Sequence, residues 1–476
     1  MSDKPLAASL AGQNHAETLG SGKTLDLVNR RQAHLGGSIL FYKEPAHIVR
    51  GEGVWLYDKA DKRYLDCYNN VASVGHCHPR VVAALSKQAS TLNTHTRYLH
   101  ENVINYTEHL ASTFPGDLEV VMLTCTGSEA NDLAMQLARM VSGNNGAVVL
   151  ENAYHGNTTL IAQMSTCMGS ADSRPDFLEA IEPPNTYRGP FRAVQGLSNE
   201  ELGDKYAGLV DNAIKKLEDK GQGVAAFMCD AVFDTQGSLE APKNYFKQVY
   251  KKIRAAGGLC IADEVQAGFC RTGKMWGFEH FDVVPDIVTL GKPMAAGHPV
   301  AGLVTTRAIA DEFAKRAFYF NTFSGNPVST LVGDTVLSIM QEDKLTENCA
   351  HVSVYLKQKL EQLQAKHTLI GNVRGLGMFI GIELVKDHET LEPATNEALA
   401  LAELMKREGV LIGATGRFGN VIKVRPPLVF SNDNADLLVE KLDKLLTEIS
   451  QKSPIEQTKK YRLKEVADDR FSPTCT

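Results

Sequence analysis

Three short stretches of the chain carry side chains that could do chemistry together. Lys292 follows the apolar run 287–290 and enters a turn rich in glycine and proline. An amine buried among apolar groups loses hydration, which lowers its pKa and leaves a neutral nucleophile for a carbonyl carbon. Asp263 ends a second apolar run, where a carboxylate requires a cation or several donors. Taken singly, Lys292 also fits a lysine that reaches solvent, and Asp263 fits a helix cap.

The third stretch has the composition of an anion-binding turn. Residues 120–126 read as a strand, Gly127 and Ser128 make a turn, and residues 129–139 have helical periodicity. Free amides at the helix start and the Ser128 hydroxyl suit a phosphate, and Gly127 allows close approach, although many such turns bind nothing. An amine for an aldehyde, an acid for a ring nitrogen and a helix start for a phosphate are the parts that pyridoxal 5′-phosphate (PLP) requires.

From about residue 51 to about residue 444 the sequence resembles the class III (ω-amino acid type) PLP-dependent aminotransferases. The motifs that carry the resemblance lie at 126–131, 154–156, 263–266 with 271–273, 290–292, 321–327 and 424–427. The resemblance implies the α/β architecture of PLP-dependent fold type I, with a large domain built on a mainly parallel seven-stranded sheet and a smaller α+β domain. It implies an aminotransferase that moves an amino group from an amine or ω-amino acid to a 2-oxo acid such as pyruvate or 2-oxoglutarate, by a ping-pong mechanism.

The resemblance also assigns roles to single residues. Lys292 is expected to bond to the cofactor aldehyde and then to move the proton between substrate and cofactor carbons, while Asp263 keeps the ring nitrogen protonated. The other expected cofactor-binding residues are Gly127 and Ser128 at the phosphate, Tyr154 and Val265 on the two ring faces, His155, Gln266 at the ring hydroxyl, and Thr322 from a neighbouring subunit. The resemblance therefore implies a homodimer, or a dimer of dimers, with shared active sites.

Arg425 is the expected substrate residue, because it stands beside Pro-Pro at a strand end and in this family grips a carboxylate. Its planar fork matches a carboxylate in two parallel bonds, which a lysine cannot reproduce. The resemblance places further side chains in the substrate pocket, namely Tyr68, Asn70, Val71 and Arg97. Two positions depart from the family pattern. Asp230 replaces a glutamate that in some members covers the arginine, and Cys270 stands where glycine is usual.

A second enzymatic function stays open. The stretches 94–102 and 321–327 are similar to the branch of the family that contains ethanolamine-phosphate and hydroxylysine-phosphate phospho-lyases. Such an enzyme requires extra cations for a second phosphate, for which Arg97 and Lys423 are candidates, whereas Arg425 favours the aminotransferase. A racemase is a third alternative. A scaffold protein without cofactor is a fourth, against which the joint presence of Lys292, Asp263 and Ser128 argues.

Composition narrows the class of protein further. The net charge of −6, without a basic run, argues against nucleic acid as a partner. Nine cysteines without a Cys-x-x-Cys pair predict reduced thiols and a cytoplasmic location. His76 and His78 lack a second ligand pair, so no metal site is expected. No segment reaches the length of a membrane span or has a secretion signal.

The hydrophobic pattern predicts the elements that position these residues. Strands are expected at 120–126, 147–151, 224–230, 259–265, 286–291 and 301–305, alternating with helices, so that ligand-binding side chains meet at the strand ends. A helix at 25–34, a hairpin at 51–68, one long helix from 327 to 367, a strand-like stretch at 372–385 and helices at 396–408 and 435–449 complete the prediction. The predicted division is an N-terminal segment (1–75) that contributes to the small domain, a large PLP-binding domain (76–326), a C-terminal small domain (327–451) and a polar tail (452–476).

Overall fold

A seven-stranded sheet forms the centre of the larger part of the molecule. The structure, a computed structural model, describes residues 23–36 and 40–451, so the predicted tail lies outside the described residues. The strands are β4 (Leu118–Thr124), β5 (Gly146–Leu150), β6 (Leu178–Ile181), β7 (Val224–Cys229), β8 (Leu259–Asp263), β9 (Ile287–Leu290) and β10 (Ala301–Thr306). Their order is β4-β10-β9-β8-β7-β5-β6, and only β10 runs antiparallel to its neighbours. The predicted α/β class and mainly parallel sheet are therefore confirmed.

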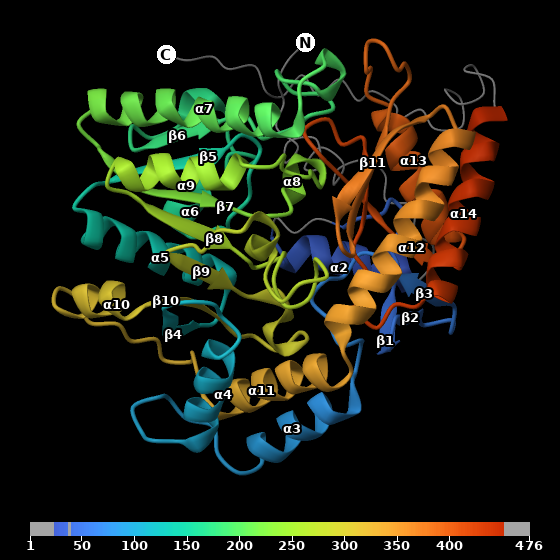
Figure 1. The fold of residues 1–476 in the computed structure, drawn as a ribbon. Coiled ribbons are helices and arrows are strands. Elements are labelled where there is room, and N and C mark those ends of the chain that lie inside the picture. The colour runs from blue at the N-terminus through green and yellow to red at the C-terminus, as the bar shows by residue number, and fades with distance from the viewer. Residues whose placement is uncertain (1–22, 37–39, 452–476) are drawn as a thin grey trace.

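Helices cover both faces of this sheet because its central strands are apolar on both sides. Val148 and Leu150 pack with the helices α7 (Asn199–Asp219) and α9 (Tyr245–Ala255), whereas Ala147 and Val149 pack with α5 (Gly127–Ser142) on the other face (Figure 1). This alternation follows from the two-residue period of a strand. The remaining helices of this part are α3 (Pro79–Ala89), α4 (Glu101–Ala111), α6 (Thr159–Met164), α8 (Asp234–Gly237), α10 (Arg307–Ala314) and α11 (Pro327–Glu342).

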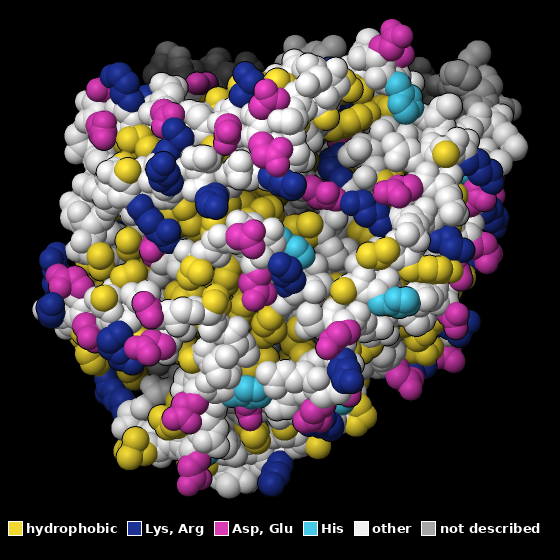
Figure 2. All heavy atoms as spheres, in the orientation of Figure 1, with side chains coloured by type: hydrophobic (Ala, Val, Ile, Leu, Met, Phe, Trp, Pro, Cys, Tyr) yellow, Lys and Arg dark blue, Asp and Glu magenta, His cyan; other side chains and the backbone are white. Residues whose placement is uncertain are grey.

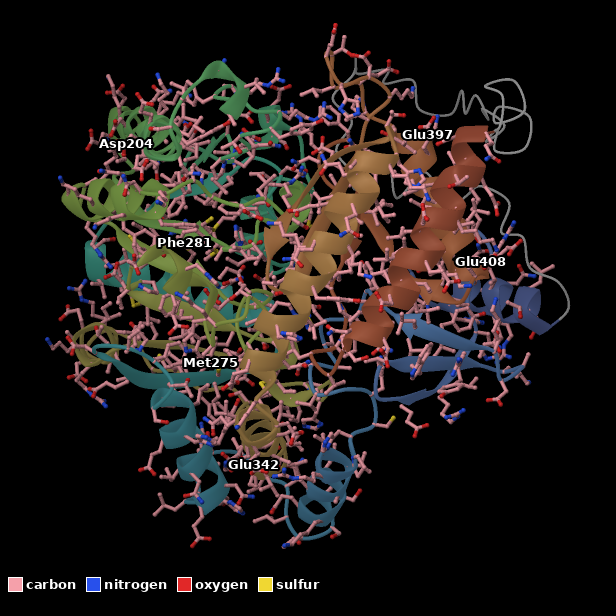
Figure 3. The ribbon with its side chains drawn as sticks, turned by 45° about the vertical axis from the view of Figure 1, so that its right-hand side comes forward. Asp204, Met275, Phe281, Glu342, Glu397 and Glu408 are labelled. Carbon is pink, nitrogen blue, oxygen red and sulfur yellow. The ribbon has the colours of Figure 1, made fainter. Side chains whose placement is uncertain are left out.

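Aromatic and charged contacts hold the outer segments to this core. Phe281, labelled in Figure 3, lies in the turn-rich stretch between β8 and β9, and its ring centroid is 4.5 Å from that of Phe246 on α9. Glu342 ends α11 and accepts hydrogen bonds of 2.6 and 3.2 Å from the guanidinium of Arg80 on α3. The first contact ties the stretch that follows Asp263 to α9, and the second ties α11 to α3.

The smaller part combines strands from both ends of the chain. One four-stranded sheet joins β1 (Ile48–Glu52), β2 (Trp55–Asp58), β3 (Arg63–Asp66) and β13 (Val410–Leu411), and the other joins β11 (Ile370–Leu376), β12 (Phe379–Leu384), β15 (Val421–Val424) and β14 (Gly413–Thr415). The helices α12 (Leu345–Lys366), α13 (Thr395–Arg407) and α14 (Asn432–Gln451) lie beside them on the right of Figure 1, and α2 (Lys23–His34) precedes the first strand.

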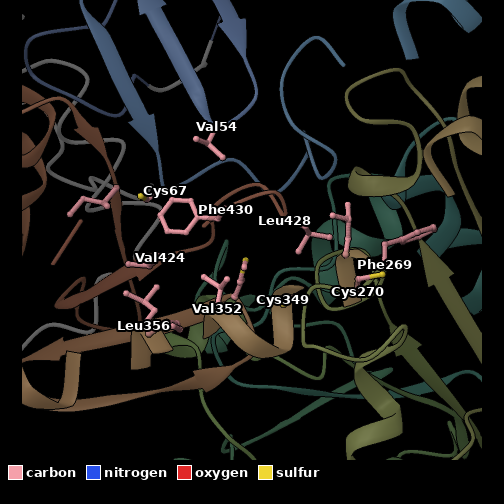
Figure 4. Close-up of a cluster of buried hydrophobic side chains, with 14 of the residues drawn as sticks. Val54, Cys67, Phe269, Cys270, Cys349, Val352, Leu356, Val424, Leu428 and Phe430 are labelled. Atoms are coloured by element: carbon pink, nitrogen blue, oxygen red, sulfur yellow. The ribbon is translucent and has the colours of Figure 1, made fainter. Parts of the chain in front are cut away.

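The parallel pairing of β3 with β13 ties the N-terminal strands to the C-terminal part. Val54 and Cys67 share one buried cluster with Leu356, Val424 and Phe430, as Figure 4 shows. Because of these contacts, we propose that the domain limits are those predicted from the sequence. Residues up to 75 then belong to the small domain.

Two predicted elements were wrong in their extent. The long helix from 327 to 367 is two helices, because Lys344 adopts the left-handed conformation (φ 51°) between α11 and α12. The strand-like stretch 372–385 is a hairpin of β11 and β12 that turns at Gly377 (φ 55°). A Cβ on Gly377 would lie 2.4 Å from the carbonyl carbon of Thr272, so the hairpin also requires glycine for its close approach to that loop.

The surface mixes charges of both signs. On the face shown in Figure 2, basic and acidic side chains alternate without a continuous basic area. Within residues 23–36 and 40–451, no helix has the length and apolar character needed to cross a membrane.

Candidate active site

Lys292 leaves the end of β9 in a strained turn that directs its amine into the protein. Its backbone has φ 25°, and it begins the 3₁₀ turn Lys292–Ala295. Burial lowers the pKa of the Lys292 amine from its ordinary value, while the Asp263 carboxylate opposes this change. The side chain therefore has the desolvated amine that the sequence predicts.

Asp263 is held at the end of β8 by three donors. Its Oδ2 accepts hydrogen bonds from Asn131 Nδ2 at 3.0 Å and from His155 Nδ1 at 2.8 Å, and its Oδ1 accepts one from the Val265 amide at 3.2 Å. The resulting carboxylate is fixed in orientation at 5% exposure. His155 therefore contacts Asp263 through its Nδ1. Its Nε2 is buried without a hydrogen-bond partner among the described residues.

The start of α5 forms the anion-binding turn. Thr126 caps the helix through a reciprocal pair of hydrogen bonds with Glu129, which leaves the amides of Gly127 and Ser128 free of side-chain caps. Ser128 Oγ accepts a hydrogen bond of 3.1 Å from the Asn157 amide. A Cβ on Gly156 would lie 2.5 Å from Ser128 Oγ, so only glycine keeps this hydroxyl in place.

These groups converge on one crevice of about 120 Å³. Its lining is Gly127, Ser128, Asn131, Tyr154, His155, Gly156, Asp230, Asp263, Val265, Gln266 and Lys292. The structure thus brings together all the predicted cofactor-binding residues except Thr322. An amine, a fixed acid, a helix start and an apolar side chain around one crevice fit PLP, whose aldehyde, ring nitrogen and phosphate each find a matching group.

Beside the crevice lies a buried network of charged side chains that includes the predicted substrate residue. Arg425 Nη1 donates to Gln266 Oε1, which also accepts a hydrogen bond of 3.1 Å from Asn70 Nδ2. Lys423 Nζ donates to Asp234 Oδ1 at 2.8 Å, and Gln266 Nε2 donates to Asp234 Oδ2. We call Lys423, Arg425 and Asp234 the charged triad.

The Tyr68 ring lies against both cations of the charged triad. It is 4.6 Å from the Arg425 guanidinium and 5.5 Å from the Lys423 amine. The predicted substrate residues Tyr68 and Arg425 therefore meet, and Asn70 joins them through Gln266.

Comparison with known proteins identifies the family. The family model described as aminotransferase class-III matches residues 42–446. The chain belongs to the class III aminotransferase family. Enzymes of this family depend on PLP, so PLP is the cofactor of this protein.

Individual relatives of this aminotransferase fall into two functional groups. The chain is 41% identical over 434 residues to alanine–glyoxylate aminotransferase 2 homolog 2, mitochondrial, from Arabidopsis thaliana, covering 89% of this chain and 88% of the relative. It is 38% identical to ethanolamine-phosphate phospho-lyase homolog 1 from Caenorhabditis elegans, covering 89% and 93%. Among solved structures, a phospholyase from Arthrobacter in complex with phosphoethanolamine matches with a TM-score of 0.85 and 42% identity, covering 89% of this chain and 99% of that one.

Asp230 lines the crevice, but its carboxylate is bound by the local backbone. Its carboxylate accepts hydrogen bonds from the amides of Val232, Phe233 and Asp234, so it closes the turn before α8. Burial raises the pKa of Asp230 to about 7, with Asp263 adding to the effect. Sequence reasoning missed Asp234, the acid that pairs with the basic residues, because a single aspartate in a polar loop carries no signal of its distant partners.

Two predicted site residues lie apart from the crevice within one chain of this aminotransferase. Thr322 is exposed, and Arg97 is exposed with its guanidinium 4.0 Å from the Phe320 ring. His76, considered as a metal ligand, instead forms a 2.7 Å hydrogen bond with Asp66 Oδ2. The described residues contain no group of three or more His, Cys, Asp or Glu side chains that could hold a metal ion.

Proposed function

We propose that this enzyme transfers an amino group from an amine, an ω-amino acid or alanine to a 2-oxo acid such as pyruvate, 2-oxoglutarate or glyoxylate. The main observation in support of this proposal is that the Arg425 guanidinium is buried and only partly hydrogen-bonded. Its guanidinium is buried, its Nε has no hydrogen-bond partner among the described residues, and Asp234, at 3.7 Å, is too far for a bidentate pair. A buried guanidinium with spare donors beside the crevice suits the carboxylate of a substrate.

We infer roles for two other residues that line the crevice. When bound, PLP supplies an aldehyde for amines and a ring that accepts the electron pair left on a deprotonated carbon. Lys292 Nζ would hold the PLP aldehyde and, as a buried amine, would serve as the proton carrier of the reaction. Asp263, oriented by His155 and Asn131, would favour the protonated form of the cofactor's ring nitrogen.

A half-reaction tests this proposal. We expect the purified holoenzyme, mixed with an amine donor alone, to convert the visible cofactor band to that of the amine form of the cofactor. Addition of a 2-oxo acid should restore the band. An unchanged spectrum across a broad panel of donors would contradict amino transfer.

One observation favours a phospho-lyase as the second candidate function. Lys423 stands two residues before Arg425, and both are buried, at 6% and 7% exposure, so two cations lie together beside the crevice, with Asp234 offsetting one of their charges. The similarity to the Arthrobacter phospholyase points the same way. Release of inorganic phosphate from phosphoethanolamine, without formation of the amine form of the cofactor, identifies this function, whereas amino transfer predicts no phosphate release.

We propose a homodimer with shared active sites, because large apolar side chains are exposed near the two predicted site residues that lie apart from the crevice. Tyr98 and Leu99, next to Arg97, are 67% and 96% exposed, and Phe323, next to Thr322, is 74% exposed. Exposed apolar side chains of this size mark association surfaces. Light scattering should give twice the chain mass, and Leu99→Asp should weaken the dimer and the affinity for PLP together; a fully active monomer would contradict shared sites.

We propose a cytoplasmic location because the cysteines are not paired in disulfides in the described part of the chain. The eight cysteines in the described part of the chain are all free thiols. The Arabidopsis relative is named mitochondrial, so fractionation of cells is the deciding test. Recovery with a mitochondrial marker would contradict this location.

A further inference from the structure

The charged triad holds a carboxylate between two cations beside the cofactor crevice. Burial alone would raise the pKa of Asp234, but Lys423 and then Arg425 hold it well below its usual range. The three side chains have 5% to 7% exposure, so their charges are weakly screened by solvent. Among these three side chains, Asp234 offsets one of the two positive charges.

The charged triad acts on the reacting groups. Gln266 lines the crevice and bonds to both Asp234 and Arg425. All three members of the triad also alter the pKa of Lys292: Arg425 and Lys423 lower it, and Asp234 raises it. An anion bound by Arg425 and Lys423 is therefore within the electrostatic reach of the amine.

Asp234 is fixed in this position by its backbone. It begins the short helix α8, its amide donates to Asp230 Oδ2, and its carbonyl accepts a hydrogen bond of 3.1 Å from Thr415 Oγ1. These contacts come from both the loop before α8 and strand β14. The carboxylate consequently faces Lys423 as a built part of the site.

We propose that Asp234 is a specificity-determining residue whose charge weights the substrate-anion site toward groups with one negative charge, such as carboxylates, and against groups with two, such as phosphates. This inference rests on the proposed function of Arg425 and Lys423 as the substrate-anion site. Each negative charge on the ligand interacts unfavourably with Asp234, so a dianion is penalised twice as strongly as a monoanion on a logarithmic scale.

The test compares two ligands of similar size on the holoenzyme at about pH 8. Propionate is a monoanion, and ethyl phosphate is mainly a dianion because its second pKa is about 6. Calorimetry without an amine donor measures both dissociation constants without turnover. We expect Asp234→Asn to tighten both, by about 10-fold for propionate and about 100-fold for ethyl phosphate.

Two further variants keep the test independent of one substitution. Lys423→Met should weaken both ligands, with ethyl phosphate losing more. The double variant Asp234→Asn with Lys423→Met removes one charge of each sign, and should return the ratio of the two constants to within about three-fold of the wild type.

Glu383→Gln is the matched control. Glu383 is also a buried carboxylate between two basic groups, with Arg188 Nε at 2.7 Å and Arg374 Nη1 at 2.7 Å, but neither belongs to the charged triad. It should leave the ratio unchanged. An unchanged ratio in Asp234→Asn, or the same shift in Glu383→Gln, would overturn the inference.

A different measurement shows whether the proposed function is wrong. If the enzyme released phosphate from phosphoethanolamine and did not transfer an amino group, the proposed function would be wrong. The ratio of the two dissociation constants would still test the role of Asp234.

Discussion

Gly156→Ala should weaken PLP binding selectively, because this glycine faces the hydroxyl expected to hold the phosphate. Gly156 has φ 138°, a conformation that costs an alanine about 1–3 kcal/mol. The added Cβ would lie 2.5 Å from Ser128 Oγ and 2.9 Å from its Cα, so Ser128 must move. Losing the hydrogen bond that Ser128 is expected to donate to the charged phosphate would cost about 1.5–3 kcal/mol.

The second cost alone corresponds to a loss of PLP affinity of about 10-fold to 150-fold, since about 1.4 kcal/mol is a factor of ten. Titration of the apoenzyme with PLP, followed by visible absorbance, measures this affinity. Gly143→Ala is the control: Gly143 also has positive φ (72°) and ends the same helix α5, but nothing lies within 4 Å of its added Cβ. Because alanine is disfavoured in the left-handed conformation, this change should lower the free energy of unfolding by about 1 kcal/mol and leave PLP affinity unchanged. Equal PLP affinity in Gly156→Ala and wild type would refute the reasoning.

Three further predictions follow from the contacts of single residues. Arg425→Lys should raise KM for the 2-oxo acid about 10-fold to 100-fold with a smaller change in kcat, because lysine cannot form the bidentate pair; steady-state kinetics with an unchanged KM would contradict this role. His155→Phe should move the pH dependence of the cofactor's visible spectrum, since Asp263 loses its 2.8 Å donor, and an identical spectral titration would make His155 merely structural. Burial raises the pKa of Glu264 to about 8, so the folded protein binds its proton more tightly than the unfolded chain, and this contribution to stability is complete below about pH 4 and is lost as pH rises to about 8. Unfolding of Glu264→Gln should therefore depend less on pH over that range than unfolding of the wild type, and parallel profiles would count against it.

The sequence predicted the central sheet because its strands are buried on both faces and are therefore continuous apolar runs. Strand β6 was not located, since its four residues include the charged Glu179. The break between α11 and α12 was also missed, because its sequence contains no residue that is typical of a break. Lys344 takes a left-handed conformation without a glycine or proline to mark it.

The cofactor crevice could be predicted because its residues lie in short local motifs at strand ends, as with Lys292 and Asp263. The charged triad could not, because Asp234 and Lys423 are 189 residues apart and meet only through the packing of β15 beside α8. Thr322 and Arg97 show a different limit. Their side chains are exposed in one chain, so their roles depend on the proposed partner subunit.

The most direct test of the account is the site at which the cofactor is attached. Borohydride reduction of the native holoenzyme, followed by peptide mapping, should place a pyridoxyl group on the Lys292 side chain at close to one per chain. Lys292→Ala should carry none and lack the visible band. A pyridoxyl group on another lysine, or none in the wild type, would contradict the central claim.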